Sequence, residues 1–350
     1  MKVLITGACG FAGSTIGEAL LAAREGLEIV GLDNFIRAGS ELNRRRLTQL
    51  GVKLIHGDIR NASDIDALPP TDFVLDCAAN PSVLAGVDGR TSSRQLIEHN
   101  LGGTSNLLEY CKAHRAGFIL LSTSRVYSIP PLAGLKVEAV DGAFRPLPQE
   151  VRGLTSEGVN EDFSTAPPVS LYGTAKLASE QLALEYGEAF DLPVWINRCG
   201  VLAGAGQFGK ADQGIFSFWI HSWRAGRPLK YIGFDGQGHQ TRDCLHPRDL
   251  VPVLFQQLDG ASGPRLQNLS GGVAQSMSLR QLSAWCASRF GPRDVALDAH
   301  PRPFDLPWLV LDSTRASTAR NWLPQSSLES VLEEIARHAE ANPHWLDMVT

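Results

Sequence analysis

The sequence predicts an α/β protein with a doubly wound parallel sheet and a smaller C-terminal substrate-binding lobe. Short apolar strands alternate with helical segments through the first half of the chain, and three glycines join the first strand to the first helix. A β-α-β alternation of this kind places parallel strands at the centre and helices on both faces. The 350 residues, 43% of them hydrophobic and 20% charged, suffice for one large domain or two modest ones.

Each expected element follows from a local pattern. Strands are expected where Val, Ile, Leu and Phe cluster between turn residues, at 3–6, 28–32, 53–56, 73–77, 117–122 and 193–197. Helices are expected at 11–25, 95–114, 171–190, 279–290 and 327–341. The Pro- and Gly-rich stretch 128–170 is expected to be irregular. Because loops of this length tend to be functional, we expect it to line the substrate pocket.

Composition excludes several classes of function. A net charge of -5 provides no basic surface for nucleic acid. No apolar run is long enough to span a bilayer, and no signal-peptide core precedes the first strand. The six cysteines show neither C-x-x-C nor zinc spacing, so no metal site is expected. Several of them lie in apolar runs, which is typical of free thiols in a reducing compartment, and we expect a cytoplasmic protein.

The glycine-rich turn predicts a dinucleotide site in a Rossmann-type domain. Gly7 permits the tight turn, Gly10 lets the backbone approach a pyrophosphate, and Gly13 lets helix and strand pack closely. The helix that follows would bind the phosphates through its free N–H groups. Asp33 lies twenty residues beyond Gly13, where a carboxylate binds the adenosine ribose, and this favours NAD over NADP. Arg37 is the one nearby side chain that suits a 2′-phosphate.

Further cofactor contacts are expected at the ends of later strands. Asp58 either contacts the adenine amino group or caps a turn, and the sequence favours neither. Ala78, Ala79 and Asn80 leave the fourth strand with side chains small enough for close backbone approach. The remaining expected cofactor residues are Phe11, Ala12, Asn34, Ile59 and Asn100.

A tyrosine and a lysine four residues apart predict the chemistry. Tyr172 and Lys176 lie on one face of the expected helix, where the ammonium would lower the pKa of the phenol. Tyr172 is then a candidate proton acceptor for a sugar or alcohol hydroxyl, with Thr123 at the end of the fifth strand beside it. The alternative is an ordinary amphipathic helix with a half-buried tyrosine and a solvated lysine.

These motifs together resemble the extended short-chain dehydrogenases/reductases of the NAD-dependent epimerase/dehydratase family. The resemblance covers nearly the whole chain, from Thr6-Gly7-x-x-Gly10-Phe11-x-Gly13 to Thr241-Arg242-Asp243-x-x-His246. It implies a catalytic trio of Thr123, Tyr172 and Lys176, with Asn100 in a supporting helix. It also implies that Arg242 binds a substrate diphosphate, although an ion pair with Asp243 would explain this arginine as well. The other expected substrate contacts are Ser124, Arg125, Asn197, Gln207, Phe208 and Gln213.

Departures from the family pattern argue against some of the reactions that the family catalyses. Dehydratases carry an Asp-Glu pair after the catalytic threonine, and glucuronate decarboxylases carry a glutamate at the second of these places. In this chain Ser124 and Arg125 occupy these two positions, which argues against both dehydration and decarboxylation. Asp33-Asn34-Phe35, Gln207-Phe208 and Asp212-Gln213-Gly214 are similar to the CDP-paratose 2-epimerase (tyvelose epimerase) branch. Asp76 stands where many relatives have histidine, and the sequence does not explain it.

The resemblance therefore implies an NAD-dependent nucleotide-sugar epimerase that transiently oxidises a ring hydroxyl, of the CDP-paratose 2-epimerase type. The alternatives are a UDP-hexose 4-epimerase, an NAD(P)-dependent sugar reductase and a non-catalytic NAD-sensing protein. We expect residues 1–198 to form the NAD-binding domain and 199–350 the substrate lobe, with chain near 230–260 returning to the sheet. A homodimer through helices 95–114 and 171–190 is implied, although burial in the core explains the apolar residues of the first helix equally well.

Overall fold

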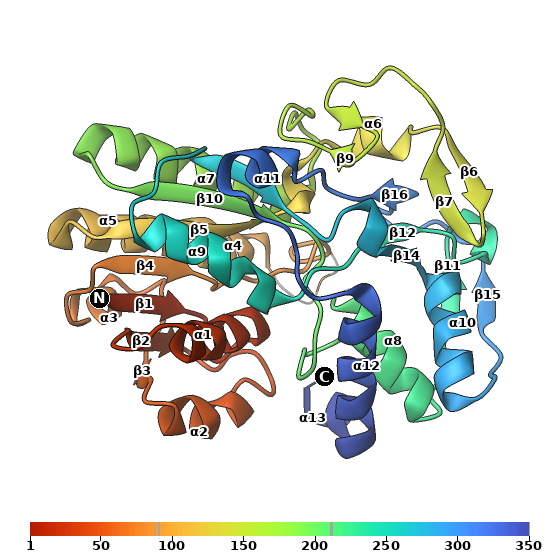
Figure 1. The fold of residues 1–350 in the computed structure, drawn as a ribbon, viewed down its shortest axis with the longest axis horizontal. Coiled ribbons are helices and arrows are strands. Elements are labelled where there is room, and N and C mark those ends of the chain that lie inside the picture. Colours follow the sequence, from red (N-terminus) through yellow and green to blue (C-terminus); the bar gives the residue numbers. More distant parts are fainter. Residues whose placement is uncertain (88, 90–91, 211–212, 350) are drawn as a thin grey trace.

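The computed structural model describes residues 1–350 apart from 88, 90, 91, 211, 212 and 350. Asp212 of the predicted Asp212–Gly214 motif therefore lies outside the described residues. A seven-stranded parallel sheet forms the larger part of the molecule, and a helical lobe with small sheets lies beside it (Figure 1). This arrangement confirms the predicted fold class.

The large sheet has the strand order β13-β10-β5-β4-β1-β2-β3, with every neighbouring pair parallel. Its strands are β1 Lys2–Thr6, β2 Glu28–Asp33, β3 Lys53–His56, β4 Phe73–Asp76, β5 Gly117–Thr123, β10 Val194–Cys199 and β13 Leu266–Leu269. The chain starts at the central β1 and winds outwards in both directions, so a crevice forms at the carboxyl ends where the winding reverses. All six strands expected from sequence are present, and β13 is an addition.

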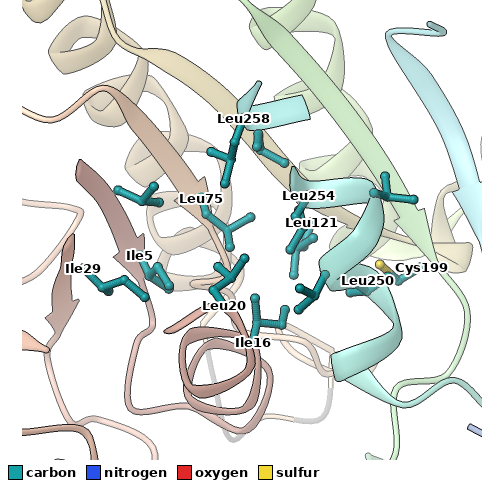
Figure 2. Close-up of a cluster of buried hydrophobic side chains, with 14 of the residues drawn as sticks. Ile5, Ile16, Leu20, Ile29, Leu75, Leu121, Cys199, Leu250, Leu254 and Leu258 are labelled. Atoms are coloured by element: carbon teal, nitrogen blue, oxygen red, sulfur yellow. The ribbon is translucent and has the colours of Figure 1, made fainter. Parts of the chain in front are cut away.

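Helices cover both faces of this sheet. Val3 and Ile5 of β1 pack with Ile16 and Leu20 on one face, whereas the intervening Leu4 faces the other side. Figure 2 shows the first face, where α1 and α9 cover the strands. Its helices are α1 Phe11–Ala23, α2 Leu42–Gln49, α9 Val251–Leu258 and α11 Thr314–Arg320. The opposite face carries α3 Ala62–Asp66, α5 Gly103–His114 and α7 Ser170–Phe190.

The expected helix 95–114 is divided by a π-helical turn. Regular helix α4 Ser93–Ile97 leads into the π-helical segment Glu98–Gly102, and α5 then begins at Gly103. A Cβ atom on Gly103 would lie 2.3 Å from Ile59 Cδ1, so a side chain there would require Ile59, in the loop after β3, to move. Asn100 lies inside the π-helical turn, and such turns are frequent at functional sites.

Segment 128–170 is more regular than its composition predicts. It contains α6 Ile129–Ala133 and two short hairpins, β6 Val137–Val140 with β7 Ala143–Pro146 and β8 Leu154–Thr155 with β9 Gly158–Val159. The hairpins are fixed to the C-terminal lobe by backbone hydrogen bonds such as Val159 N to Val310 O at 2.8 Å. The expectation of an irregular segment was wrong because these long-range contacts leave no local signal.

The C-terminal lobe packs its own core beside the sheet (Figure 1). Its helices are α8 Ile215–Arg224, α10 Leu279–Phe290, α12 Leu328–Ala341 and α13 Trp345–Val349. Its strands form two small sheets, β11 Lys230–Ile232 with β15 Ala296–Asp298, and β12 Thr241–Asp243 between β14 Ser276–Ser278 and β16 Trp308–Leu309. Short 3₁₀ turns occur at Ser124–Val126, Phe234–Gly236, Pro247–Leu250 and Val273–Gln275.

Chain from beyond residue 198 returns to the large sheet as α9, β13 and α11. The division of the chain at residue 198 therefore stays a proposal about function rather than a boundary between separate bodies. In the described part of the chain, no helix has both the length and the apolar character needed to cross a membrane.

Candidate active site

The carboxyl ends of the central strands open into one cavity of about 380 Å³. Its wall runs from the glycine turn after β1 to Tyr172 on α7, so the predicted cofactor and catalytic residues share one space. The predicted residues that line it are Gly7, Gly10, Phe11, Ala12, Asp33, Asn34, Arg37, Ile59, Ala78, Ala79, Thr123, Ser124, Arg125, Tyr172, Gln207, Phe208 and Gln213.

The glycine turn forms a cradle that side chains would fill. Gly7 has a φ of +59°, and a Cβ atom there would approach Ala78 Cα to 3.0 Å. A Cβ atom on Gly13 would lie only 2.3 Å from the Gly7 carbonyl oxygen. Helix α1 begins after Gly10 with no side-chain cap, so its first N–H groups remain available to an anion. The turn therefore suits the pyrophosphate of a dinucleotide.

Asp33 ends β2 at the edge of this cradle. Its carboxylate accepts hydrogen bonds from Cys9 N and Phe35 N, each at 2.8 Å. Burial raises the pKa of this carboxyl group, and the backbone donors oppose that shift. The side chain is thus oriented by the backbone, with its position in the cavity wall matching a ribose contact.

Asp58 does not line the cavity. Its carboxylate forms an ion pair with Arg60 at 2.6 Å, accepts a hydrogen bond from Asn34 Nδ2 at 2.9 Å and caps the Arg60 backbone N–H. Arg60 holds the pKa of this carboxyl group well below its usual range. Of the two alternatives for Asp58, this geometry supports the turn-capping role. Of the hydrogen-bonded residues Asn34 and Asp58, Asn34 lines the cavity.

Polar atoms without partners remain in the cavity wall. Ser40 Oγ, His99 Nε2 and Gln207 Oε1 are buried, line the cavity and have no hydrogen-bond partner among the described residues. Buried polar atoms are normally paired, so these three fit a polar ligand. With the cradle, they show that the residues present suit NAD. Sequence reasoning missed Ser40 and His99 because neither belongs to a local motif.

Arg37 connects the two parts of the molecule across the cavity. Its guanidinium donates to the carbonyl oxygen of Phe208, which lies in the loop after β10. Phe208 in turn stacks on Trp345 of the C-terminal helix α13. Arg37 is therefore engaged by the opposite lobe, and this agrees with NAD rather than NADP as the cofactor.

Thr123 and Tyr172 form the centre of the candidate catalytic site. Thr123 Oγ1 accepts the Arg125 N–H at 3.1 Å, and the Thr123 side chain is near enough to the Tyr172 hydroxyl to lower its pKa. Burial raises the pKa of Tyr172 to about 12, and Thr123 and then Arg125 counteract this rise. The expectation that Lys176 lowers this pKa is not met. The cation that acts on Tyr172 is Arg125.

Lys176 is not among the described residues that line the cavity and acts instead on groups at the ends of β4 and β10. Its side chain is buried, and its charge lowers the pKa of Asp76, Cys77 and Cys199 against the effect of burial. Asp76 accepts a hydrogen bond from Thr6 Oγ1 at 2.6 Å and is itself buried. Burial raises the pKa of this carboxyl group, and the Lys176 charge and the Thr6 hydrogen bond oppose the rise, so the aspartate at this place interacts with the buried lysine.

Asn100 and Asn80 support the site from outside the cavity. Asn100 Oδ1 accepts Asn80 N at 2.8 Å, and its amide donates to Asn80 O at 3.1 Å. The Asn100 carbonyl accepts the Ser179 hydroxyl of α7 at 3.0 Å. The π-helical turn thus fixes the Asn80 turn relative to the helix that carries Tyr172.

Two expected substrate residues do not reach the cavity. Asn197 is fully buried and bonded to Gln257 and Gln267, each at about 3.0 Å, inside the core. Arg242 donates to the Thr241 and Leu306 carbonyls and lies 3.4 Å from Asp305. The expectation for segment 128–170 is also not met, since no described residue from it lines the cavity.

Comparison with known proteins agrees with this geometry. Residues 3–267 match the "NAD dependent epimerase/dehydratase family". The chain is 30% identical to a CDP-paratose 2-epimerase of Salmonella typhi over 96% of its length and 98% of that protein. It is 26% identical to a UDP-glucuronate 4-epimerase of Thermodesulfobacterium geofontis, over 97% and 96%. A UDP-glucuronic acid 4-epimerase of Bacillus cereus, solved with UDP-glucuronic acid and NAD, superposes with a TM-score of 0.75 at 26% identity, covering 97% of this chain and 99% of that one.

Proposed function

Since the chain belongs to the NAD-dependent epimerase/dehydratase family, we propose that it is a nucleotide-sugar epimerase of the CDP-paratose 2-epimerase type. The observation that carries the proposal is that Thr123 and Tyr172 line the same cavity as the glycine cradle. A proton acceptor and a dinucleotide site in one space are what reversible oxidation of a sugar hydroxyl requires.

NAD, when bound, accepts and returns the hydride. The Thr123 side chain lowers the pKa of Tyr172, so its hydroxyl would donate to the phenolate that takes the proton from the sugar hydroxyl. The Arg125 guanidinium acts in the same direction through its charge. By the resemblance to the family, Lys176 would hold the nicotinamide ribose, and its charge acts on the neighbouring Asp76. Tyr172 returns the proton after the keto sugar has turned its other face.

Epimerisation rather than elimination is supported by the residues after Thr123. Ser124 is buried in the cavity wall and Arg125 stands beside it, so no carboxyl group is available there to remove a ring proton. The whole-length match to a CDP-paratose 2-epimerase supports a CDP-linked sugar and inversion at C2.

We also propose a homodimer formed through α5 and α7. These helices lie on one face of the sheet, and Phe190 at the end of α7 and Ile97 at the end of the preceding α4 are exposed by 38% and 44%. Light scattering should give twice the mass of one chain, and Phe190→Glu should lower it to that of one chain. A wild-type protein with the mass of one chain would contradict the proposal.

A proton NMR time course with purified protein and no added cofactor tests the reaction. CDP-linked 3,6-dideoxyhexoses and UDP-hexoses form the panel, and we expect inversion at C2 of the CDP-sugar. Inversion at C4 of a UDP-hexose instead would assign the other epimerase branch. Turnover only after NADH or NADPH is added, with its stoichiometric loss, would show a reductase and contradict the proposal.

A further inference from the structure

Arg125 is held in the cavity wall by its own backbone. Its N–H donates to Thr123 Oγ1 at 3.1 Å. Its carbonyl oxygen presses against α7 directly beside Tyr172, because a Cβ atom on Gly173 would lie 2.3 Å from that oxygen. The backbone of residue 125 is therefore fixed between the two groups of the candidate catalytic pair, and its side chain starts from the wall of the cavity.

The Arg125 guanidinium has few partners in the protein. A guanidinium carries five N–H donors. Nη1 of Arg125 donates a hydrogen bond to the Phe304 carbonyl at 3.5 Å, which is the limit of hydrogen-bond distance. In the part of the chain that the structure describes, no carboxylate lies within 4.0 Å of it, whereas Arg242 has Asp305 at 3.4 Å. A partly buried cation with so few acceptors fits an anion supplied by a ligand.

The surroundings of Arg125 carry an excess of positive charge. Arg242 and Arg302 repel its guanidinium, and Asp305 is the carboxylate that attracts it. Burial, followed by Arg242, lowers the pKa of Arg125 to about 10, so the side chain remains charged at neutral pH. Arg242 is directed towards backbone carbonyls, and Arg125 is the arginine of this pair that lines the cavity.

The place of Arg125 restricts where the ligand anion lies. The guanidinium and the Tyr172 hydroxyl interact electrostatically and line the same cavity. An oxyanion bound by Arg125 is therefore close to the sugar carbon whose hydroxyl Tyr172 deprotonates. In a nucleotide sugar the diphosphate is attached at C1, next to C2 and across the ring from C4. A uronic acid carries its carboxylate at C5, next to C4.

Resting on the proposed epimerase function, we propose that Arg125 binds a substrate oxyanion adjacent to the epimerised carbon. The oxyanion is the sugar-linked phosphate when C2 is inverted, or a ring carboxylate when C4 is inverted. A neutral hexose inverted at C4 offers Arg125 neither group. Arg125 thus restricts both the class of sugar and the carbon that reacts.

The test compares wild type with Arg125→Gln, Arg125→Lys and a control, Arg145→Gln, which removes an exposed arginine of β7. Each is assayed by NMR with a CDP-3,6-dideoxyhexose, UDP-glucuronate and UDP-glucose, and each is titrated calorimetrically with the same three compounds. Loss of a charge-assisted hydrogen bond should raise KM and Kd by roughly ten- to a hundredfold in Arg125→Gln, with less effect in Arg125→Lys. NAD content and melting temperature show whether a variant is folded.

Inversion of the CDP-sugar at C2 identifies the phosphate as the oxyanion, and preference for UDP-glucuronate over UDP-glucose identifies a carboxylate. Equal turnover of UDP-glucose and UDP-glucuronate at C4, unaffected in Arg125→Gln, would overturn the inference. If wild type inverts none of the three sugars, the proposed function fails, and the titrations still decide the role of Arg125. In that case, equal Kd values for wild type and Arg125→Gln would overturn the proposed role of Arg125, and a larger Kd for the variant would support it.

Discussion

Removing the Thr123 hydroxyl tests how Tyr172 becomes a base. In Thr123→Val the Tyr172 phenolate loses the hydroxyl that is proposed to donate a hydrogen bond to it, and the Arg125 N–H loses its acceptor at 3.1 Å. A hydrogen bond to a charged oxygen contributes about 1.5–3 kcal/mol, which corresponds to a roughly ten- to 150-fold lower kcat at neutral pH. Because this hydrogen bond opposes the rise in pKa caused by burial, its loss raises the pKa further. The rising limb of kcat against pH should therefore move to higher pH.

The assay is the initial rate of epimerisation from pH 6 to 10, with Thr174→Val as the matched control. Thr174 lies two residues from Tyr172 on the exposed side of α7, and its hydroxyl donates to the Ser170 carbonyl of the same helix. The control should keep the wild-type profile. An unchanged rate and pH profile in Thr123→Val would refute the role given to this hydroxyl.

Three further predictions concern the cofactor cradle, the core and pH. Gly13→Ala should abolish copurification of NAD, measured by absorbance after denaturation, because its Cβ atom would lie 2.3 Å from the Gly7 carbonyl oxygen; retained NAD would contradict the cradle. Glu180→Gln should lower the free energy of unfolding by about 3–5 kcal/mol in urea titrations, because it leaves the buried Arg198 charge without its partner at 2.6 Å. A loss below about 1 kcal/mol would show that Arg198 finds another partner. Burial and then a neighbouring histidine lower the pKa of His221 to about 3, so the unfolded chain binds the proton first as pH falls from 6.5. Stability should drop by roughly 3–4 kcal/mol from this group between pH 7 and pH 3, and a His221→Gln variant should show a shallower dependence.

Local spacing made much of the fold and the site predictable. The glycine turn and the Tyr172–Lys176 pair each depend on positions within one turn and one helix, so sequence alone places them. The six strands expected in the large sheet were predictable for the same reason, since each is a short apolar run before a turn. Parallel pairing then brings their carboxyl ends, and with them Thr123 and Asp33, to one edge.

Other features depend on contacts between distant segments. Asn197 ends the strand expected from sequence, as a substrate residue would. In the structure β10 continues to Cys199, and the partners Gln257 and Gln267, 60 and 70 residues further along, hold Asn197 in the core. The pKa of Tyr172 depends mainly on the burial of its side chain. The spacing between Tyr172 and Lys176 in the sequence cannot predict that burial.

The most direct test of the central claim is the rate of C2 inversion of a CDP-3,6-dideoxyhexose by Tyr172→Phe and by Tyr186→Phe, followed by proton NMR without added cofactor. Tyr186 lies on the same helix, where its hydroxyl donates to Glu109 on the surface. We predict no detectable inversion by Tyr172→Phe, wild-type inversion by Tyr186→Phe, and equal NAD content in both. Inversion by Tyr172→Phe at the wild-type rate would show that another group moves the proton and would contradict the account.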